Sequence, residues 1–400
     1  MQTSIQSIFS NYTKGKSIFV NKDALSTSYM PGSVTHRDEP MNNIANILAP
    51  CLRGERPSNI FAYGKTGTGK TLCVNYVVGE LLKNTGQNGS IRTVAVNCKM
   101  RKIADTEYRL VAQLCKELGK QVPATGLPTS KIYEIFNDLL DGKKQNVILV
   151  LDEIDTLIKK AGDEILYNLT RINQELKQAK LTIIGITNNL SFAEGLDPRV
   201  KSSLSEEEVF FKPYDALELR DILQQRSQIA FARGALSEGV VEKCSALAAQ
   251  EHGDARRALD LLRVAGEIAE RNNETAITEK HVDLAQDKIN LDKIMEAVRT
   301  QPKQSQAVLW SAIKIMEVKK EIATGEVYEQ YKKVCKKRGL ASLGQRRVSD
   351  LITELGMLGI LNTKIISKGR YGRTKEIKPA VPAQLLDDIK TVLGKDFYFE

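Results

Sequence analysis

The sequence predicts an α/β domain with a doubly wound parallel sheet, then an all-helical domain, then a basic domain of helices and one hairpin. Apolar segments typical of buried strands alternate with amphipathic helices over the first half of the chain. Strand patterns disappear from about residue 215 to 290, where helical spacing dominates. Residues 301–400 hold 19 Lys and Arg against 11 Asp and Glu, a net charge of +8 in a chain whose total is +9.

Composition limits the class of protein. The chain has 400 residues, of which 42% are hydrophobic and 27% are charged, and both values are typical of globular proteins with more than one domain. No apolar run approaches the roughly 20 residues that a membrane-spanning helix needs, and residues 1–10 do not resemble a secretory signal. The six cysteines are scattered without a C-x-x-C pair, so neither a zinc site nor a disulfide framework is expected.

The elements follow in a regular order along the chain. In the first domain we expect strands at 59–63, 91–97, 147–151 and 181–187, with helices that begin at Leu72 and cover about 108–118 and 130–140. In the second domain we expect four helices, at 220–232, 240–250, 255–271 and 278–288. Pro213 and the polar residues 301–304 mark the boundaries, so the predicted domains are 1–212, 213–298 and 299–400.

Residues 64–71 read G-K-T-G-T-G-K-T, which is the G-x-x-x-x-G-K-T pattern between a strand and a helix. Glycines let successive backbone N–H groups point inward at phosphate oxygens, and the helix that follows adds its positive N-terminus. Lys70 is expected to reach the β- and γ-phosphates, and the Thr71 hydroxyl is expected to bind Mg²⁺. The pattern predicts an ATP/ADP site with Mg²⁺, formed by Gly64, Lys65, Thr66, Gly67, Thr68, Gly69, Lys70, Thr71 and Leu72.

Polar residues end two of the expected buried strands. Asp152 and Glu153 follow strand 147–151, and we expect Asp152 to hold Mg²⁺ and Glu153 to deprotonate the attacking water. Asn188 follows the next strand, and its amide is expected to hold that water or a phosphate oxygen. Asn189 is the second choice, and a simple turn formed by the Asn-Asn pair stays an alternative.

The last domain has the pattern of a winged helix. Helices are expected at 305–318 and 325–338, and a third starts at a capping box over 342–345. A hairpin of 361–367 and 373–377 follows, with its turn at 368–372. The third helix would enter the DNA major groove; a protein-binding winged helix or a merely solvated basic surface are the alternatives. The apolar face of this third helix consists of Val348, Leu351, Ile352, Leu355 and Leu358. Its opposite face consists of Arg346, Ser349, Asp350 and Thr353.

These motifs together resemble the AAA+ ATPases. Residues 253–262 (GDARRALDLL) resemble the sensor-2 helix of the replication initiators, 36–39 (HRDE) resemble their adenine-side motif, and 196–204 (LDPRVKSSL) resemble their arginine-bearing box. Over roughly residues 15–390 the chain resembles the archaeal origin-recognition and cell-division-control initiators, relatives of the large subunit of the eukaryotic origin recognition complex. The resemblance implies an AAA+ base domain, a helical lid and a winged helix.

The resemblance also implies roles for single residues. Arg256 would be the sensor-2 arginine that contacts the γ-phosphate, with Arg257 the second choice. Arg199 would be an arginine finger offered to a neighbouring subunit, although the same Asp-Pro-Arg could cap the structure locally. The family has a DNA-contacting helical insertion at the position of about residues 99–130 in this chain, where an ordinary basic surface helix is the alternative. The other implied residues are His36, Arg37 and Tyr214 for the nucleotide, and Lys99, Arg101, Lys102, Arg346, Arg347, Lys368, Arg370 and Arg373 for DNA.

The function implied by the resemblance is that of an ATP-dependent DNA replication initiator. Its partners would be double-stranded origin DNA, the minichromosome maintenance helicase and other initiator subunits, and slow ATP hydrolysis would act as a switch. We expect a cytoplasmic, nucleoid-associated protein. Two alternatives stay open: a clamp-loader subunit, which normally lacks a basic winged helix, and a transcription factor regulated by ATP.

Overall fold

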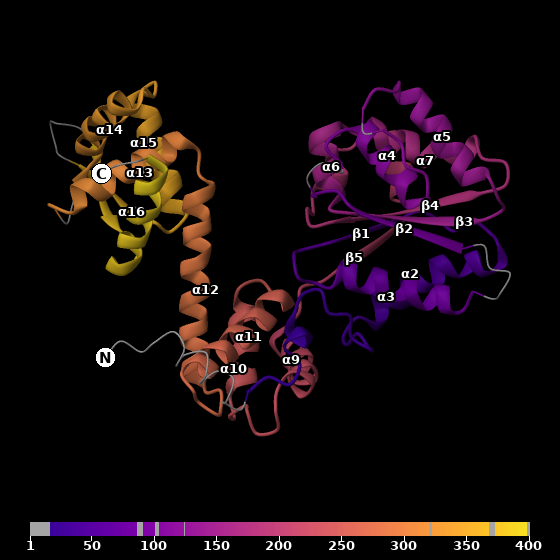
Figure 1. Ribbon diagram of the computed structural model, residues 1–400, viewed down its shortest axis with the longest axis horizontal. Coiled ribbons are helices and arrows are strands. Elements are labelled where there is room, and N and C mark those ends of the chain that lie inside the picture. The colour runs from indigo at the N-terminus through magenta and orange to yellow at the C-terminus, as the bar shows by residue number, and fades with distance from the viewer. Residues whose placement is uncertain are drawn as a thin grey trace. The chain divides into compact units, whose positions relative to one another are not determined.

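The computed structural model describes residues 17–85, 91–100, 104–123, 125–319, 322–367 and 373–397 (Figure 1). The chain divides into two compact units, residues 1–282 and 283–400, and each is described by itself. The first unit contains the parallel sheet and most of the helical region that we call the lid. In the described part of the chain, no helix is both long enough and apolar enough to cross a lipid bilayer.

A five-stranded parallel sheet forms the centre of the first unit, in the order β2-β3-β4-β1-β5. The predicted doubly wound parallel sheet is confirmed, and the edge strand β5 adds to the strands that the sequence predicted. The central strand β3 is buried along nearly its whole length, as its continuous apolar pattern requires. The strands are β1 (Ile60–Gly64), β2 (Ile91–Asn97), β3 (Asn146–Asp152), β4 (Lys180–Thr187) and β5 (Glu207–Phe211).

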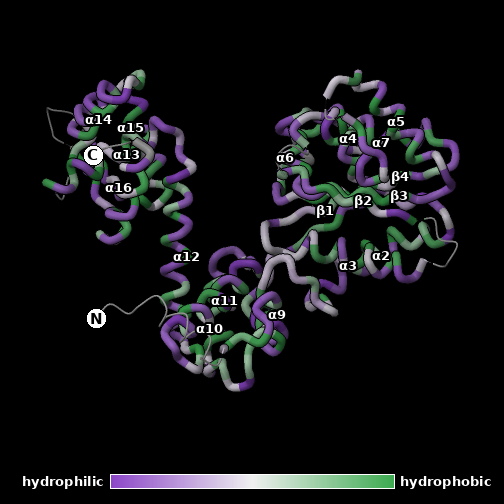
Figure 2. Tube along the Cα trace, viewed as in Figure 1, coloured by the Kyte–Doolittle hydropathy of each residue, from purple (hydrophilic) through white to green (hydrophobic). Residues whose placement is uncertain are grey.

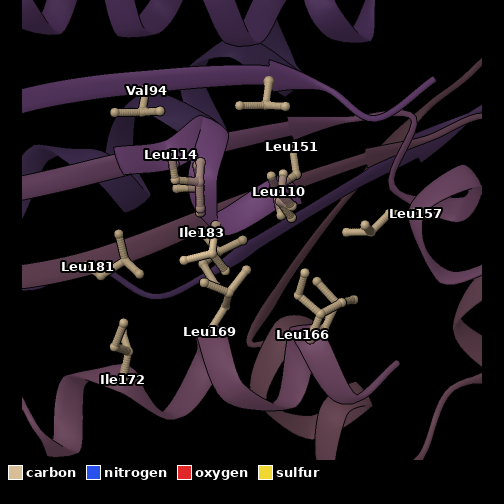
Figure 3. Packing of buried hydrophobic residues seen from close by; sticks show 14 of the residues in the cluster. Val94, Leu110, Leu114, Leu151, Leu157, Leu166, Leu169, Ile172, Leu181 and Ile183 are labelled. Carbon is tan, nitrogen blue, oxygen red and sulfur yellow. The ribbon is translucent and has the colours of Figure 1, made fainter. Parts of the chain in front are cut away.

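Helices cover both faces of this sheet (Figure 1). On one face the core residues Leu110, Leu114, Leu166 and Leu169 of the helices meet apolar strand residues such as Ile183 (Figure 3). The central strands β3 and β4 are accordingly mainly hydrophobic, whereas the covering helices alternate between hydrophobic and hydrophilic positions (Figure 2). One face carries α2 (Asp38–Leu48) and α3 (Lys70–Lys83), and the other carries α4 (Glu107–Glu117), α5 (Thr129–Asp141), α6 (Ile154–Ala161) and α7 (Glu164–Arg171).

Shorter elements complete the sheet domain. The helix α8 (Pro198–Leu204) precedes β5, and its N-cap is Asp197, whose carboxylate accepts a hydrogen bond from the Arg199 amide at 2.8 Å. Short 3-10 helices lie at η2 (Ala49–Arg53), η3 (Ile172–Gln174) and η4 (Phe192–Gly195).

The lid is made of α9 (Ala216–Ala230), α10 (Val240–Gln250), α11 (Ala255–Arg271) and the start of α12 (Glu279–Thr300). A reciprocal capping box of Asp215 and Glu218 fixes the start of α9. The N-terminal residues pack on these helices: the rings of Phe19 and Phe231 lie 5.0 Å apart, and the amide of Val20 donates to the Ala230 carbonyl at 2.8 Å. We call residues 17–35, which include η1 (Lys22–Leu25), the N-terminal strap.

The second unit has the helices and the hairpin of a winged helix, as predicted. Its sheet is antiparallel, in the order β6-β8-β7, and β6 and α16 are elements that the sequence analysis did not predict. The elements are α13 (Lys303–Met316), β6 (Ile322–Ala323), α14 (Thr324–Arg338), α15 (Gln345–Met357), β7 (Leu361–Ser367), β8 (Arg373–Pro379) and α16 (Ala383–Phe397).

The predicted capping box at Ser342 is wrong. Helix α15 starts three residues later, with Gly344 as an N-cap that makes no side-chain cap hydrogen bond. The reason lies in a tertiary contact, since the Leu343 amide donates to the hydroxyl of buried Tyr331 at 3.1 Å and holds the preceding turn outside the helix. The predicted apolar face of α15 is otherwise buried, except that Leu358 lies just past the helix end and is 39% exposed.

Candidate functional site

A cavity of about 370 Å³ lies between the sheet domain and the lid, within the first unit. The parallel register places Asp152 at the end of β3 opposite Ile186 of β4, so Asn188 emerges at the same edge of the sheet. Helix α11 of the lid contributes Arg256 from the other side. Of the predicted site residues, those that line the cavity are Gly67, Thr68, Gly69, Lys70, Thr71, Leu72, Asp152, Glu153, Asn188, Tyr214 and Arg256.

Two glycines of the phosphate-binding loop are required by their surroundings. Gly67 and Gly69 have φ values of 68° and 91°, which side-chain-bearing residues rarely adopt. A Cβ atom on Gly67 would lie 1.7 Å from the Asp254 carboxylate, and one on Gly69 would lie 2.8 Å from the Tyr214 hydroxyl. The Ala255 amide also donates to the Gly67 carbonyl at 3.1 Å. The loop therefore touches the N-terminus of lid helix α11 directly.

Lys70 is buried at the first position of α3. Its ammonium donates to the carbonyls of Gly64 and Lys65 at 2.9 and 2.6 Å, and to the Thr68 hydroxyl at 3.3 Å. Burial, together with the nearby positive charge of Arg256, lowers the pKa of Lys70 to about 8, although the carboxylates of Asp152 and Asp254 oppose that shift. The direct hydrogen-bond partners of this ammonium are neutral oxygens, and incoming phosphate oxygens would give it negatively charged ones.

Thr71 and Asp152 lie together at the end of β3, where the Thr71 hydroxyl donates to the Asp152 carboxylate at 3.1 Å. Both groups offer hard oxygen ligands, which Mg²⁺ prefers, and two protein oxygens are the usual number because phosphate and water supply the rest. The donor set therefore fits Mg²⁺ bound with a nucleotide.

Glu153 lies at a strained position next to the cavity. Its φ of 54° is in the left-handed region, where it forms the N-cap position of α6. One carboxylate oxygen, Oε1, lies 3.7 Å from the Lys99 ammonium, and the other, Oε2, is buried and accepts no hydrogen bond from the residues that the structure describes. A buried carboxylate oxygen without a donor is suited to accept a proton from a water molecule bound beside it.

In each of the two pairs Asn188/Asn189 and Arg256/Arg257, one residue lines the cavity and the other does not. Asn188 lines the cavity, whereas the Asn189 side chain accepts from the Ser191 amide at 3.1 Å and so holds a turn. Arg256 is exposed towards the cavity, whereas Arg257 is buried and pairs with Glu251 at 3.0 Å.

Other residues predicted to bind the nucleotide do not line the cavity. Gly64, Lys65 and Thr66 lie outside it, although two of their carbonyls hold Lys70. His36 contacts Asp221 of the lid helix α9 at 3.0 Å. Arg37 is buried and donates to the carbonyls of His36, Thr68 and Lys212, with its guanidinium 3.5 Å from the ring centre of Tyr214.

Arg199 lies away from the cavity, on α8. Its guanidinium forms two hydrogen bonds with the Asp197 carboxylate, at 3.1 and 3.0 Å, and faces the Tyr167 ring at 5.1 Å. These bonds raise the pKa of Arg199 and lower that of Asp197. The side chain is 65% exposed, so a neighbouring molecule could reach it.

The structure describes the side chains of only some of the predicted DNA-binding residues. Arg346 and Arg347 are exposed on the first turn of α15, and Arg347 pairs with Glu354 at 3.0 Å. Lys99 is exposed and paired with Glu153 as described above. Arg373 begins β8, but its side chain is not described. Arg101, Lys102, Lys368 and Arg370 lie outside the described residues.

The sequence analysis missed the part of the cavity that the N-terminal strap and helix α9 form. Residues 26–31 and 33–35 of the strap line it together with Gln225 and Arg226 of α9. The Gln225 amide donates to the Ser33 hydroxyl at 2.9 Å, and the Arg226 guanidinium lies 4.6 Å from the ring centre of Tyr29. No motif marks these residues, because their role depends on how the strap folds back onto the lid.

Comparisons with known proteins agree with this architecture. Residues 53–191 match the family model described as AAA domain, and residues 220–287 match the Cdc6 AAA+ ATPase-type lid domain. Residues 296–388 match the C-terminal winged helix domain of CDC6.

Similar proteins cover the whole chain. The ORC1-type DNA replication protein of Thermococcus onnurineus is 54% identical over 381 residues, which is 94% of this chain and 91% of that protein. The Pyrococcus furiosus protein of the same name is 51% identical, and the match covers 99% of this chain and 94% of that protein. A solved structure of the Aeropyrum pernix ORC1 protein in complex with DNA matches with a TM-score of 0.79 and 43% identity, over 95% of this chain and 97% of that one. The chain therefore belongs to the ORC1/Cdc6-type DNA replication initiators, which are AAA+ ATPases with a winged-helix DNA-binding domain.

Proposed function

We propose that this chain is an ATP-dependent replication initiator that binds origin DNA through its winged helix and its 99–130 insertion, and helps to recruit the minichromosome maintenance helicase. The observation that carries the proposal is the shared cavity: Asp152, Glu153 and Asn188 line it from the sheet domain, and Arg256 lines it from the lid. One nucleotide bound there would contact both parts at once. The state of that nucleotide could therefore control how the lid closes.

In the proposed reaction, water attacks the γ-phosphorus of ATP while the bond to the β-phosphate oxygen breaks, which gives ADP and phosphate. Glu153 accepts the proton of that water, and Asn188 orients it. Lys70 stabilises the charge on the β- and γ-phosphates. Mg²⁺ held by Thr71 and Asp152 would neutralise the charge of the same oxygens.

The proposed switch depends on the contact between the phosphate-binding loop and the lid. Arg256 would contact the γ-phosphate, which ADP lacks, so ATP would favour the closed lid more than ADP does. Asp254 already packs against Gly67 at the start of the same helix. Hydrolysis would then be slow and would act as a reset of the DNA-binding state.

The proposed partners follow from charge and from the relatives. The Aeropyrum pernix protein was solved in complex with DNA, and the basic winged helix of this chain supports the same kind of partner. Arg199 is proposed to act on a nucleotide of another initiator subunit, because it lies outside the chain's own cavity. We place the protein in the cytoplasm, associated with the nucleoid.

ATP affinity is predicted to fall as the pH rises above about 8. The Lys70 ammonium must be protonated to pair with phosphate, and its pKa in the free protein is about 8. Bound phosphates would raise that pKa, so binding takes up a proton above pH 8 and takes up none at pH 7 or below. Titrations with a fluorescent ATP analogue between pH 6.5 and 9.5 measure this trend. An affinity that stays flat up to pH 9.5 would show that Lys70 stays protonated over this range and would contradict its lowered pKa.

Loss of winged-helix arginines is predicted to flatten the salt dependence of DNA binding. Each lost phosphate contact lowers the slope of log K against log salt by about 0.9, so affinity and slope fall together. The variant replaces Arg346, Arg347, Arg370 and Arg373 with alanine, and the control replaces four exposed lysines of the first unit, Lys83, Lys143, Lys144 and Lys177. A slope that falls equally in both proteins would move the DNA site away from the winged helix.

A further inference from the structure

Lys375 on strand β8 lies in the same basic domain as the proposed DNA contacts, but its ammonium is directed at helix α15. Its ammonium donates to the Ser349 carbonyl at 3.1 Å, to the Ser349 hydroxyl at 3.1 Å and to the Thr353 hydroxyl at 2.6 Å. An ammonium has three N–H donors, so these contacts use all of them. Lys375 would have to leave helix α15 before it could bind a phosphate.

The direction of Lys375 follows from the period of a β-strand. Residues two apart point to the same face, so Lys375 shares a face with Ile377, which is completely buried in the core of the unit. Strand β8 pairs along its whole length with β7, with Lys375 opposite Ile365. The Lys375 side chain therefore joins the hairpin to helix α15 at the edge of the apolar core.

This contact changes which part of α15 can reach DNA. The polar face predicted from sequence consists of Arg346, Ser349, Asp350 and Thr353. Lys375 forms hydrogen bonds with the side chains of Ser349 and Thr353. Thr353 also donates to the Ser349 carbonyl at 2.9 Å, so both hydroxyls lie in one closed network. The exposed positions that stay open on this face are Arg346 and Asp350, at the N-terminal end of the helix.

We propose that Lys375 is a positioning residue that fixes the β7–β8 hairpin against helix α15, so that the two can contact one DNA duplex together. The proposal rests on the proposed DNA-binding function of the winged helix. Hydrogen bonds from a charged donor are among the stronger ones in proteins. Here three of them connect helix α15 to the hairpin that follows it. Without them the hairpin would sample several positions, and DNA binding would have to select one of them.

The test uses the full chain and a fluorescein-labelled duplex of mixed sequence. Lys375→Met should weaken binding about tenfold, as expected when hydrogen bonds from a charged group are lost, while the slope of log K against log salt stays unchanged. Thr353→Val removes an acceptor without changing the charge and should weaken binding in the same direction. The double variant should bind no more weakly than Lys375→Met alone, because both changes break one contact. Lys375→Arg keeps several donors and should restore most of the affinity.

Two controls separate this role from loss of folding and from loss of charge. Trp310 is the chain's single tryptophan and is buried in the core of the same unit, so an unchanged emission maximum shows that the variants are folded. Lys378→Met removes the same charge from the same strand, at a residue that is 48% exposed and pairs with Glu376, and should leave amide exchange in the hairpin unchanged.

Hydrogen exchange distinguishes failure of this proposal from failure of the proposed function. In Lys375→Met the amides of 361–367 and 373–378 should exchange about tenfold faster, while those of α13 stay protected. Unchanged exchange in the hairpin would overturn the positioning role even if DNA binding is weakened. A salt slope lowered by about 0.9 in Lys375→Met, with no effect of Thr353→Val, would show instead that Lys375 contacts a phosphate. If the unmodified chain does not bind the duplex, the DNA-binding function fails, and the exchange data still decide the role of Lys375.

Discussion

Replacement of Lys70 with alanine is expected to weaken ATP binding by about 100-fold, which corresponds to roughly 2.7 kcal/mol. The change removes a buried ammonium whose present partners are two backbone carbonyls and one hydroxyl. Charge-assisted hydrogen bonds to phosphate are worth about 1.5–3 kcal/mol each, and Lys70 is expected to make more than one. Anisotropy of a fluorescent ATP analogue measures the affinity directly.

The matched control for Lys70 is another lysine of the same helix. Lys83 lies in the last turn of α3, is exposed and pairs with Glu80 at 2.7 Å, so Lys83→Ala should leave ATP affinity unchanged. Thermal unfolding of both variants without nucleotide shows whether α3 is intact. ATP affinity that is equal in Lys70→Ala and in the unmodified chain would sink the assignment of the phosphate-binding loop.

Glu153→Gln is expected to keep ATP binding and to reduce hydrolysis by about 100- to 10,000-fold, the usual effect of losing a general base. Glutamine has nearly the shape of glutamate but cannot accept the proton of the attacking water. Among the described residues, none donates a hydrogen bond to the buried oxygen Oε2, so the substitution removes the group best placed for this task. Phosphate release under saturating ATP gives the turnover, and ATP anisotropy gives the affinity.

Glu164→Gln provides the control for Glu153. Glu164 is an exposed carboxylate in the first turn of α7, outside the residues that line the cavity, and its replacement should change neither turnover nor affinity. Turnover of Glu153→Gln at the rate of the unmodified chain would refute the role of Glu153 as the base.

The fold and the phosphate end of the site were largely predictable because local sequence fixes them. Each local pattern predicts one kind of element: the glycine loop predicts a phosphate-binding turn, and the apolar runs before Asp152 and Asn188 predict buried strands. Because parallel strands end at the same edge of a sheet, these residues are expected to lie together. The winged helix was predictable for the same reason, from the apolar face of its third helix and the hairpin that follows. Strand β5 was missed because three glutamates precede its apolar residues, 209–211.

The remaining features depend on contacts between distant residues. Arg37 belongs to the 36–39 motif that the resemblance assigns to the nucleotide, but the structure buries it against Thr68 and Lys212. Its neighbours in sequence do not indicate this burial. Residues 26–35 line the cavity because the strap folds onto α9. Ser349 and Thr353 lie on the polar face that the sequence predicts for the third helix of the winged helix, and only the structure shows that Lys375 hydrogen-bonds to both.

The central claim is that the nucleotide controls sequence-specific DNA binding, and one titration tests it most directly. A labelled duplex with an origin repeat is compared with a scrambled duplex of equal composition, with ATP or ADP present, over a series of salt concentrations. We predict a strong preference for the repeat, a steep salt slope and a clear difference between ATP and ADP. Equal, weak binding to both duplexes, whichever nucleotide is present, would contradict the account and favour a clamp-loader-like ATPase that finds DNA through its partners.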